Sequence, residues 1–336
     1  ADDPNGCKET DNTLIWELQR DITAAIREVD ANHLIVIEGN CWGNNYKNLP
    51  PLWDDNLVVS FHKYWSYNTQ DVIQWVLDLR AERNVPVWLG ESGENSNVWF
   101  TNAIGLVERH GIGWAWWPLK KLGNNNPLEI RMSPGYQRLV DYWRGDAERP
   151  TADEAYAALM RFAEDLKLEN NIYHRDVVDA MMRQPHTTDV LPFKDHTVGG
   201  AGTSRVFAVD YDLGRHGFAY ADADTGNYYV STGGERTPWN RGRAYRNDGV
   251  DIDGGPGAEA SAYHVGWTEA GEWLQYTILA DEAGLYTVGV EHAAAGPGAV
   301  SLQVNGAAVG EAVVLPATGG ETDWRVTAVP GVRLEK

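Results

Sequence analysis

Two patterns of hydrophobic and polar positions divide this chain, and the first occupies residues 11–145. Apolar side chains recur at the three-to-four-residue spacing of an amphipathic helix in four segments, residues 11–29, 69–83, 96–110 and 134–143. Four short apolar runs are typical of buried strands, at residues 33–39, 56–64, 85–91 and 112–118. Because strands and helices alternate at this spacing, we predict a parallel sheet with right-handed crossover connections.

The second pattern begins after a helical stretch and a linker. Residues 151–183 are predicted to be purely helical, starting at a cap-like Thr-Ala-Asp-Glu sequence, and residues 184–204 are rich in Pro, Gly, Thr and His. From Arg205 onward, short alternating segments are separated by glycine-rich turns, as in 273–278 and 286–290. This second pattern predicts a β-sandwich.

Composition and charge narrow the classes of partner. A formal net charge of −20 repels nucleic acid and anionic membranes, and no run of about 18 uncharged apolar residues could span a bilayer. The chain has 15 Trp and 15 Tyr against 6 Phe, an excess of rings that combine an apolar face with a polar edge. Such rings stack on sugars, so we expect a polysaccharide partner, although core packing explains most single Trp residues.

In parallel β/α barrels the active site lies at the carboxyl ends of the strands, so the residues that close each predicted strand are the candidate chemistry. Because side chains alternate along a strand, Val87, Leu89 and Glu91 are expected to share one face. By the same rule His62 and Tyr64 share a face of the preceding strand. Neighbouring strands would therefore place an imidazole and a phenol beside the Glu91 carboxylate.

The last predicted strand adds a ring to this set. Gly113, Ala115 and Trp117 share one face, which places an indole at the mouth of the pocket. The combination fits glycoside hydrolysis, in which a carboxylate attacks the anomeric carbon while hydrogen bonds hold and orient it. Two alternatives stay open, namely Glu91 as a salt-bridged structural carboxylate and His62 as a core histidine.

Three motifs resemble a known family. Phe61–Trp65, Trp88–Glu94 and Gly113–Lys120 resemble, in order and spacing, the sixth, seventh and eighth strands of glycoside hydrolase family 5, the cellulase family of (β/α)8 barrels. The resemblance covers about residues 11–145. It implies an α/β fold that is a partial (β/α)8 TIM barrel, strands five to eight, with a helical extension.

The resemblance also assigns roles to single residues. Glu91 would be the nucleophile, with His62 and Tyr64 as its hydrogen-bond partners and Trp117 as the ring that stacks on the sugar. Weaker candidates for contacts to neighbouring sugar units are Trp42, Asn95, Lys120 and Lys121.

One element of the family pattern is absent from these residues. The general acid/base of the family is a Glu in an Asn-Glu-Pro motif, and this sequence contains no such motif. Retention needs two carboxyl groups about 5 to 5.5 Å apart. Glu38 closes the first predicted strand, but it corresponds to the fifth strand of the family and would be a poor substitute. We therefore expect strands one to four upstream of Ala1 and an inactive fragment.

The C-terminal part resembles a second family. Two segments, 245–252 and 265–276, resemble family 6 carbohydrate-binding modules, which are jelly-roll-like all-β sandwiches. The resemblance implies that Tyr245 and Trp324 line a sugar-binding cleft, while core packing stays an alternative for Trp324. Modules of this family often carry a structural calcium ion, for which the sequence assigns no ligands. Trp267 and Trp273 are expected in the sandwich core.

These inferences give three predicted regions and one leading function. Residues 1–148 would be the C-terminal half of a hydrolase barrel, 149–204 a helical extension with a linker, and 205–336 a truncated carbohydrate-binding sandwich. The predicted function is a secreted, retaining β-glycosidase without a catalytic cofactor, most simply an endo-β-1,4-glucanase acting on a plant β-glucan. A non-catalytic carbohydrate-binding protein is the main alternative, and a structural adaptor is a third. Whether Cys7 and Cys41 pair is left open.

Overall fold

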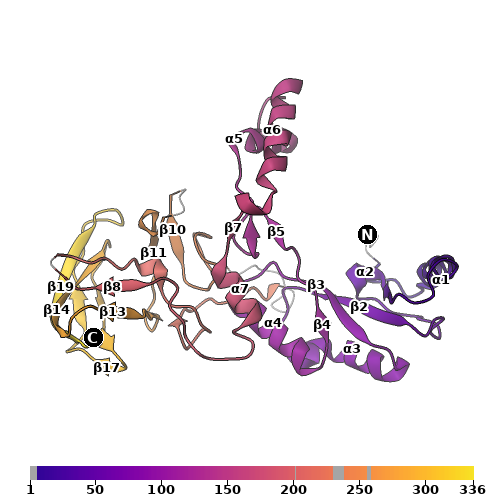
Figure 1. Ribbon diagram of the computed structural model, residues 1–336, viewed down its shortest axis with the longest axis horizontal. Helices are drawn as coiled ribbons and strands as arrows, with labels where there is room; N and C mark the ends of the chain where they lie inside the picture. Colours follow the sequence, from indigo (N-terminus) through magenta and orange to yellow (C-terminus); the bar gives the residue numbers. More distant parts are fainter. Residues whose placement is uncertain (1–5, 201, 230–237, 256–258) are drawn as a thin grey trace. The chain divides into compact units, whose positions relative to one another are not determined.

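The computed structural model describes residues 6–200, 202–229, 238–255 and 259–336 and divides the chain into two compact units (Figure 1). The first unit comprises Ala1–Phe193 and Phe207–Gln275, and the second comprises Lys194–Val206 and Tyr276–Lys336. This division differs from the predicted one, because residues 207–275 pack with the first unit and not with the strands that follow them.

A four-stranded parallel sheet organises the first unit (Figure 1). Its strands follow one another in chain order, β1 (Ile35–Glu38), β2 (Leu57–Lys63), β3 (Val87–Ser92) and β4 (Gly113–Trp114). All four coincide with predicted strands. The first unit is therefore a partial (β/α) barrel, as the alternation of strands and helices indicated.

Helices accompany these strands. They are α1 (Thr13–Arg27), the short α2 (Asn40–Gly43), α3 (Gln70–Arg83), α4 (Asn97–Arg109) and α5 (Pro134–Arg144), of which α2, α3 and α4 connect consecutive strands. Ser96 caps α4 by accepting a hydrogen bond from the Trp99 backbone N–H, and Ser133 caps α5 in the same way. Both caps precede the apolar runs that the sequence pattern identified, which explains why these helix boundaries were predicted well.

One face of the sheet packs against the helices. Val59, Phe61 and Leu89 are fully buried in a cluster that also contains Ile73 and Val76 of α3. Buried apolar side chains of this kind supply most of the stabilising free energy of a domain, about 1.5–3 kcal/mol for each side chain. The helix-facing side is therefore the core, and Ser60 and His62 of β2 lie on the other side, against Glu38.

The register between β2 and β3 changes at Gly90. Phe61 of β2 lies opposite Leu89 of β3. The next pair joins His62 to Glu91, so Gly90 is an extra residue that forms a β-bulge. Bulges of this kind turn the side chains that follow them, and this one lies directly before the candidate nucleophile.

Because of the bulge, Glu91 lies on the face of the sheet opposite to the predicted one. Val87 and Leu89 lie in the helix-side core, whereas Glu91 contacts His62 of β2 and Tyr64, just after β2, on the opposite side. The prediction that all three share a face is wrong, because one extra residue shifts the alternation. A Cβ at Gly90 would lie 2.1 Å from the Ser60 hydroxyl, so only glycine permits this close approach.

The rest of the first unit contains short elements. They are β5 (Lys120–Lys121), β6 (Leu128–Glu129), α6 (Ala152–Asp165), η1 (Leu168–Asn170), β7 (Ile172–Tyr173) and α7 (Arg175–Met182). The prediction of a purely helical 151–183 is wrong, because β7 pairs with β6 and interrupts it. Helix α6 packs against α5, where the rings of Tyr136 and Phe162 stack at 3.8 Å.

Residues 207–275 contribute short elements to the same unit. They are η2 (Ala208–Asp210), β9 (Tyr220–Ala221), β10 (Ile252–Gly254), η3 (Ala260–Ala262), β11 (Tyr263–Val265) and β12 (Trp273–Leu274). Buried hydrogen bonds join this segment to the barrel part, for example from Asn95 Nδ2 to the Asn227 carbonyl at 2.7 Å. The segment is thus an integral part of the first unit.

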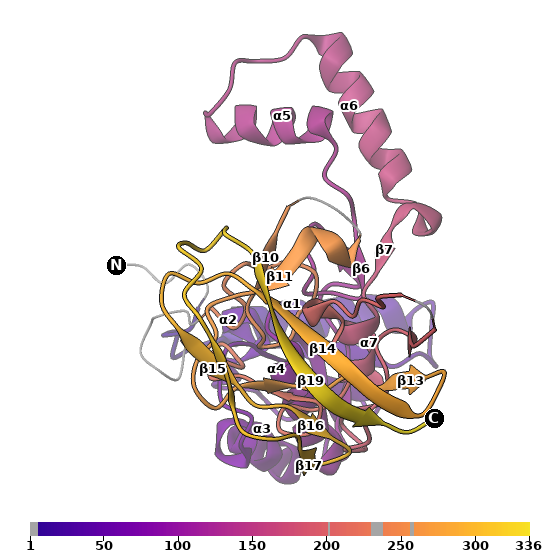
Figure 2. The ribbon, with the colours of Figure 1, turned by 90° about the vertical axis from the view of Figure 1, so that its left-hand side faces the viewer.

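The second unit is rich in β-structure, as predicted. Its strands pair as β8 (His196–Val198) with β13 (Ile278–Ala280), β14 (Gly284–His292) with β19 (Arg325–Leu334), β15 (Gly298–Val300) with β18 (Val313–Leu315), and β16 (Gln303–Val304) with β17 (Ala307–Ala308). Figure 2 shows β14 and β19 as a long antiparallel pair. Part of the predicted linker is therefore a strand, because β8 lies within it.

Candidate active site

Four polar side chains meet at the carboxyl ends of β1, β2 and β3. His62 Nε2 lies 3.2 Å from Glu38 Oε1. Its other ring nitrogen, Nδ1, lies 3.3 Å from Glu91 Oε2, and the Tyr64 hydroxyl donates a hydrogen bond of 3.1 Å to the same oxygen. The structure thus brings Glu91, His62 and Tyr64 together, as the strand pattern indicated, and adds Glu38.

The carboxylates of this cluster are open to solvent and its imidazole is not. The exposed fraction of the side chain is 46% for Glu38 and 33% for Glu91, but only 13% for His62. A ligand above the sheet can therefore contact either carboxylate. The imidazole between them acts as a support and not as a contact surface.

Burial and the neighbouring charges shift the proton affinities of these groups. The hydrogen bond from His62 lowers the pKa of Glu38, and the hydroxyl of Ser60, 2.7 Å from Glu38 Oε1, adds to this effect. Burial lowers the pKa of His62, but the hydrogen bond to Glu38 and the charges of Glu38 and Glu91 outweigh it and raise the pKa overall. Burial and the charge of Glu91 raise the pKa of Tyr64, so its phenol stays a hydrogen-bond donor.

Helix α2 supports the imidazole from behind. The side-chain oxygen of Asn44, just after α2, accepts a hydrogen bond of 3.1 Å from the His62 backbone N–H. Gly43 has φ +76° and lies against the ring, where a Cβ would come within 3.3 Å of His62 Cδ2. A larger residue at position 43 would therefore suffer backbone strain and press on the imidazole.

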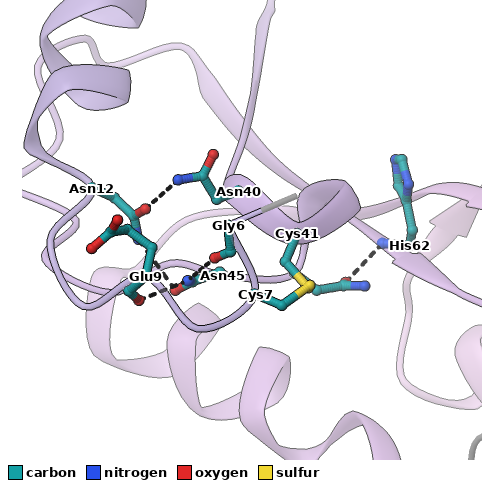
Figure 3. Close-up of a disulfide and its surroundings, with 9 residues drawn as sticks. Gly6, Cys7, Glu9, Asn12, Asn40, Cys41, Asn45 and His62 are labelled. Atoms are coloured by element: carbon teal, nitrogen blue, oxygen red, sulfur yellow. Dashed lines mark hydrogen bonds between the residues drawn. A yellow bond between two sulfur atoms is a disulfide. The ribbon is translucent and has the colours of Figure 1, made fainter. Parts of the chain in front are cut away.

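A disulfide and a set of asparagines hold α2 in turn (Figure 3). Cys7 and Cys41 are bonded, which answers the question that the sequence left open. Asn45 Nδ2 donates to the carbonyls of Gly6 and Glu9 at 2.7 and 3.0 Å. The segment before α1 is thereby tied to α2, and through α2 to the imidazole of the site.

Two exposed aromatic rings, Trp117 and Trp42, and the partly buried ring of Trp65 flank the cluster. Trp117 follows β4 and is 52% exposed, and its backbone N–H donates to the Ser92 carbonyl at the end of β3. Trp42 in α2 is 62% exposed. Trp65 lies next to Tyr64, with ring centroids 5.9 Å apart. Flat rings at the rim of a polar cluster can stack on sugar faces.

Asn95 and the two lysines proposed from the sequence lie in different settings. Asn95 is fully buried, and both its amide nitrogen and its oxygen bond the backbone of Asn227. The prediction that it contacts substrate is therefore wrong. Lys120 Nζ donates to the Leu166 carbonyl, and Lys121 forms an ion pair with Glu94 at 3.1 Å. Both ammonium groups therefore already have a partner within the protein.

The two proposed cleft residues of the C-terminal module belong to different compact units. Tyr245 is in the first unit, where its hydroxyl bonds Asp210 and its ring packs against Tyr263 at 4.9 Å. Trp324 is in the second unit and is 46% exposed. The predicted sandwich, residues 205–336, is thus divided between the two compact units at Gln275.

Two further indoles depart from the sequence prediction. Trp267 and Trp273 are 47% and 41% exposed, so the prediction that they fill a sandwich core is wrong. The segment that carries them belongs to the first unit, in which Val250, Ile252 and Ala260 are buried while the two indoles are partly exposed.

Within the described ranges, no three or more His, Cys, Asp or Glu side chains are grouped so that they could hold a metal ion. The structural calcium suggested by the sequence stays a prediction. No helix among the described residues is long and apolar enough to cross a bilayer.

Sequence reasoning underrated Glu38 and passed over Trp65. The signal for Glu38 was present, because it closes a strand as Glu91 does, but the family pattern has no role for it. The signal for Trp65 was its place beside Tyr64. The support from α2 and the disulfide had no local signal, since it depends on contacts between distant segments.

Family models match two parts of the chain. Residues 4–123 match the cellulase family, glycosyl hydrolase family 5, and residues 246–335 match carbohydrate binding module family 35. The second match corrects the family 6 assignment that the sequence suggested. It also begins within the first compact unit and ends in the second.

Solved structures give weaker likenesses. The Cel5A protein of Thermotoga maritima, solved in complex with cellobiose, is 16% identical, with a TM-score of 0.30, over 38% of this chain and 52% of that one. A mannanase catalytic domain from Streptomyces sp. SirexAA-E is 19% identical, with a TM-score of 0.28, over 38% and 48%. The cellulose synthase subunit Z of Clostridioides difficile is 20% identical, with a TM-score of 0.28, over 33% and 49%. The chain thus spans about half the length of each, and likeness at this level carries no argument about function.

Proposed function

We propose that the protein is a retaining β-glycosidase that cleaves a plant polysaccharide, most simply an endo-β-1,4-glucanase, and the match of residues 4–123 to the cellulase family, glycosyl hydrolase family 5, supports this proposal. The observation that carries the proposal is the Glu91 carboxylate. It is accessible to solvent, bonded by the Tyr64 hydroxyl and adjacent to the His62 imidazole.

This environment suits a nucleophile. In the proposed first step a Glu91 oxygen bonds to the anomeric carbon, and the bond between that carbon and the leaving oxygen breaks. With a natural sugar leaving group, that oxygen must take a proton from a general acid, and the given residues contain no Asn-Glu-Pro glutamate for this role. Tyr64 donates to Glu91 Oε2 and thereby orients the carboxylate. Trp117 at the rim supplies a flat surface for the sugar ring beside the scissile bond.

The C-terminal match supports a second part of the proposal. A carbohydrate-binding module raises the effective concentration of the enzyme at an insoluble substrate. The exposed indole of Trp324 is a candidate sugar contact in the second unit. We also propose that the protein acts outside the cell, since disulfides such as that between Cys7 and Cys41 persist mainly in oxidising compartments.

A trapping experiment tests the nucleophile without relying on a general acid. A 2-deoxy-2-fluoro-β-cellobioside with a dinitrophenolate leaving group needs no protonation as it departs, so the first step depends on the nucleophile alone. We expect mass spectrometry to show one fluoroglycosyl group per chain, carried by the peptide that contains Glu91.

The controls separate the two candidate functions. Glu91→Gln should take up no label, while Glu94→Gln, three residues along the chain, should be labelled normally. If the wild-type chain binds β-glucan but takes up no label, the non-catalytic binding function is supported and the glycosidase proposal fails.

A further inference from the structure

The imidazole of His62 lies between two carboxylates, one at each ring nitrogen. Resting on the function proposed above, we propose that Glu38 is a positioning residue that holds His62 as a doubly protonated imidazolium beside the nucleophile Glu91. Glu38 would act through His62 and would not contact the sugar carbon itself. Neither the family models nor the sequence resemblance assigns it such a role.

The geometry favours the doubly protonated ring. A neutral imidazole has one N–H and one lone pair. With carboxylate oxygens 3.2 and 3.3 Å from its two nitrogens, a neutral ring would direct its lone pair at a negative oxygen. Protonation of both nitrogens replaces this repulsion by attraction at each side, and the charge is held where little water screens it.

Glu38 is the better anchored of the two carboxylates. Its contact with Nε2 has hydrogen-bond geometry, and the Ser60 hydroxyl donates to the same oxygen at 2.7 Å. The contact of Glu91 with Nδ1 has the distance of an ion pair without hydrogen-bond geometry, so Nδ1 lacks a hydrogen-bond partner in the described chain. Glu38 therefore orients the ring, whereas Glu91 is oriented by the Tyr64 hydroxyl and lies beside Nδ1 without a hydrogen bond to it.

The remaining groups around the ring do not replace Glu38. Gly43 of α2 and Asn44, just after α2, carry no charge, and Tyr64, just after β2, contributes its phenol. Glu94, in the loop after β3, is paired with Lys121. Glu38 and Glu91 are thus the charged groups that the described contacts place against the imidazole.

The arrangement has a consequence for a retaining mechanism. When Glu91 forms an ester bond to the sugar, its carboxylate loses its negative charge. The imidazolium would then have lost one of its two counter-ions, and Glu38 would be the one that remains. Glu38 thereby keeps the proton on His62 through both steps, so that the environment of Glu91 is restored after each turnover.

The test measures the protonation of His62 directly. We would follow the histidine ring signals of the intact chain by NMR from pH 5 to 9 and assign His62 by the signal that His62→Gln removes. In Glu38→Gln, which preserves shape but not charge, we expect the pKa of His62 to fall by about one unit or more. Glu94→Gln removes an equal charge nearby without touching the ring and should leave the pKa within about 0.3 units.

Two additional readouts keep the proposal falsifiable. If Glu38→Gln does not fold, Glu38→Asp withdraws the carboxylate by one methylene and should give the same fall. In the Glu38 variant that folds, the fall in the rate of Glu91 labelling at alkaline pH should begin at a lower pH than in the wild type. An unchanged His62 pKa, or an equal shift in Glu94→Gln, would overturn the role of Glu38. The titration needs no substrate, so its failure is distinguishable from failure of the glycosidase proposal.

Discussion

The first unit contains two clusters of charged and polar side chains whose surroundings differ. The first, the site cluster, consists of Glu38, His62, Tyr64 and Glu91 and is open to solvent at its carboxylates. The second, the Arg246 cluster, consists of Asn97, Asp176, Arg246, Asn247 and Asp248 and is buried throughout.

The Arg246 cluster is satisfied by its own members and their neighbours. The Arg246 side chain is 1% exposed, bonds Asp248 through Nε and Nη2 at 2.9 and 2.6 Å, and lies over the Tyr211 ring at 3.7 Å. Asp176 Oδ2 accepts from Asn97 and from the Asn247 backbone at 2.7 and 2.8 Å. Such complete pairing offsets the cost of burying charge and joins residues 246–248 to the start of α4.

Similar residue types form an enclosed, structural group in the Arg246 cluster and an open group in the site cluster. In the Arg246 cluster a protein partner occupies each position around the charges, so no place is left for a ligand. In the site cluster both carboxylates keep accessible surface and one ring nitrogen lacks a hydrogen bond. Polar atoms that stay exposed or without a hydrogen bond, and not charge alone, distinguish a candidate active site from a structural cluster.

The largest expected effect separates the clusters by activity. Glu91→Gln should reduce the rate at which an activated aryl cellobioside releases its phenolate on the order of 10⁴-fold or more, because it removes the attacking carboxylate on which this first step depends. Its denaturation midpoint should stay near that of the wild type, since the side chain is one-third exposed. Stopped assays measure the activity of the variant, and urea unfolding measures its stability. A lowered urea midpoint with retained activity would show that Glu91 is a structural residue.

The Arg246 cluster should show the opposite behaviour. Arg246→Ala leaves Asp248 buried without its cation and should lower the free energy of unfolding by about 3–5 kcal/mol. Arg333→Ala is the matched control, since it breaks an exposed pair with Glu335 and should leave the urea midpoint unchanged. Equal midpoints for both variants would show that the buried pair does not hold residues 246–248 in place.

The disulfide connects stability to the site cluster. Cys7→Ser combined with Cys41→Ser should cost about 2–4 kcal/mol of unfolding free energy, because the cross-link restricts the unfolded chain. The variant should also broaden the NMR signal of His62, since α2 supports that ring. A sharp, unshifted His62 signal would show that α2 holds its position without the cross-link.

Trp117 tests the rim of the site cluster. Trp117→Ala should weaken binding of a soluble cello-oligosaccharide by roughly 5–10-fold, in keeping with about 1–1.5 kcal/mol for a stacked ring. Trp143→Ala removes an indole of similar exposure from α5 and should leave the affinity unchanged. Isothermal titration with both variants distinguishes a specific platform from general loss of aromatic surface.

The smallest expected effect is on the pH dependence of stability. Because folding raises the pKa of His62, protonated His62 stabilises the fold fully below its ordinary pKa of about 6.5, and this stabilisation is lost as the pH rises through the raised pKa. Because folding lowers the pKa of Glu38, ionised Glu38 stabilises the fold fully above its ordinary pKa, and this stabilisation is lost as the pH falls through the lowered pKa. Glu38→Gln should therefore lower Tm by roughly 1–2 °C near pH 5.5 and by less at pH 9. A constant difference across this range would contradict the charge pair.

Local periodicity was enough to predict the scaffold of the first unit. The four strands and the helices between them follow from apolar spacing and caps, which act within a few residues of one another. The grouping of Glu91 with His62 and Tyr64 also followed, because these residues close adjacent parallel strands. The roles proposed for them stay predictions until the labelling experiment is done.

Long-range contacts decided what the pattern could not. The bulge at Gly90 turns Glu91 away from the face of Leu89, and it arises from the pairing of β3 with β2. Asn95 became a buried anchor because a segment more than 130 residues away bonds to it. The same packing placed Tyr245 in the first unit.

The amino-acid sequence by itself determined the order of strands and helices, the positions of the strand-end acids and the β-rich character of the last part. Tertiary structure alone decided which polar groups are enclosed by partners and which stay open, as the contrast between Asp248 and Glu91 shows. The physical reason is that hydrogen-bond satisfaction depends on neighbours brought together by folding, and these neighbours leave no periodic trace in the sequence.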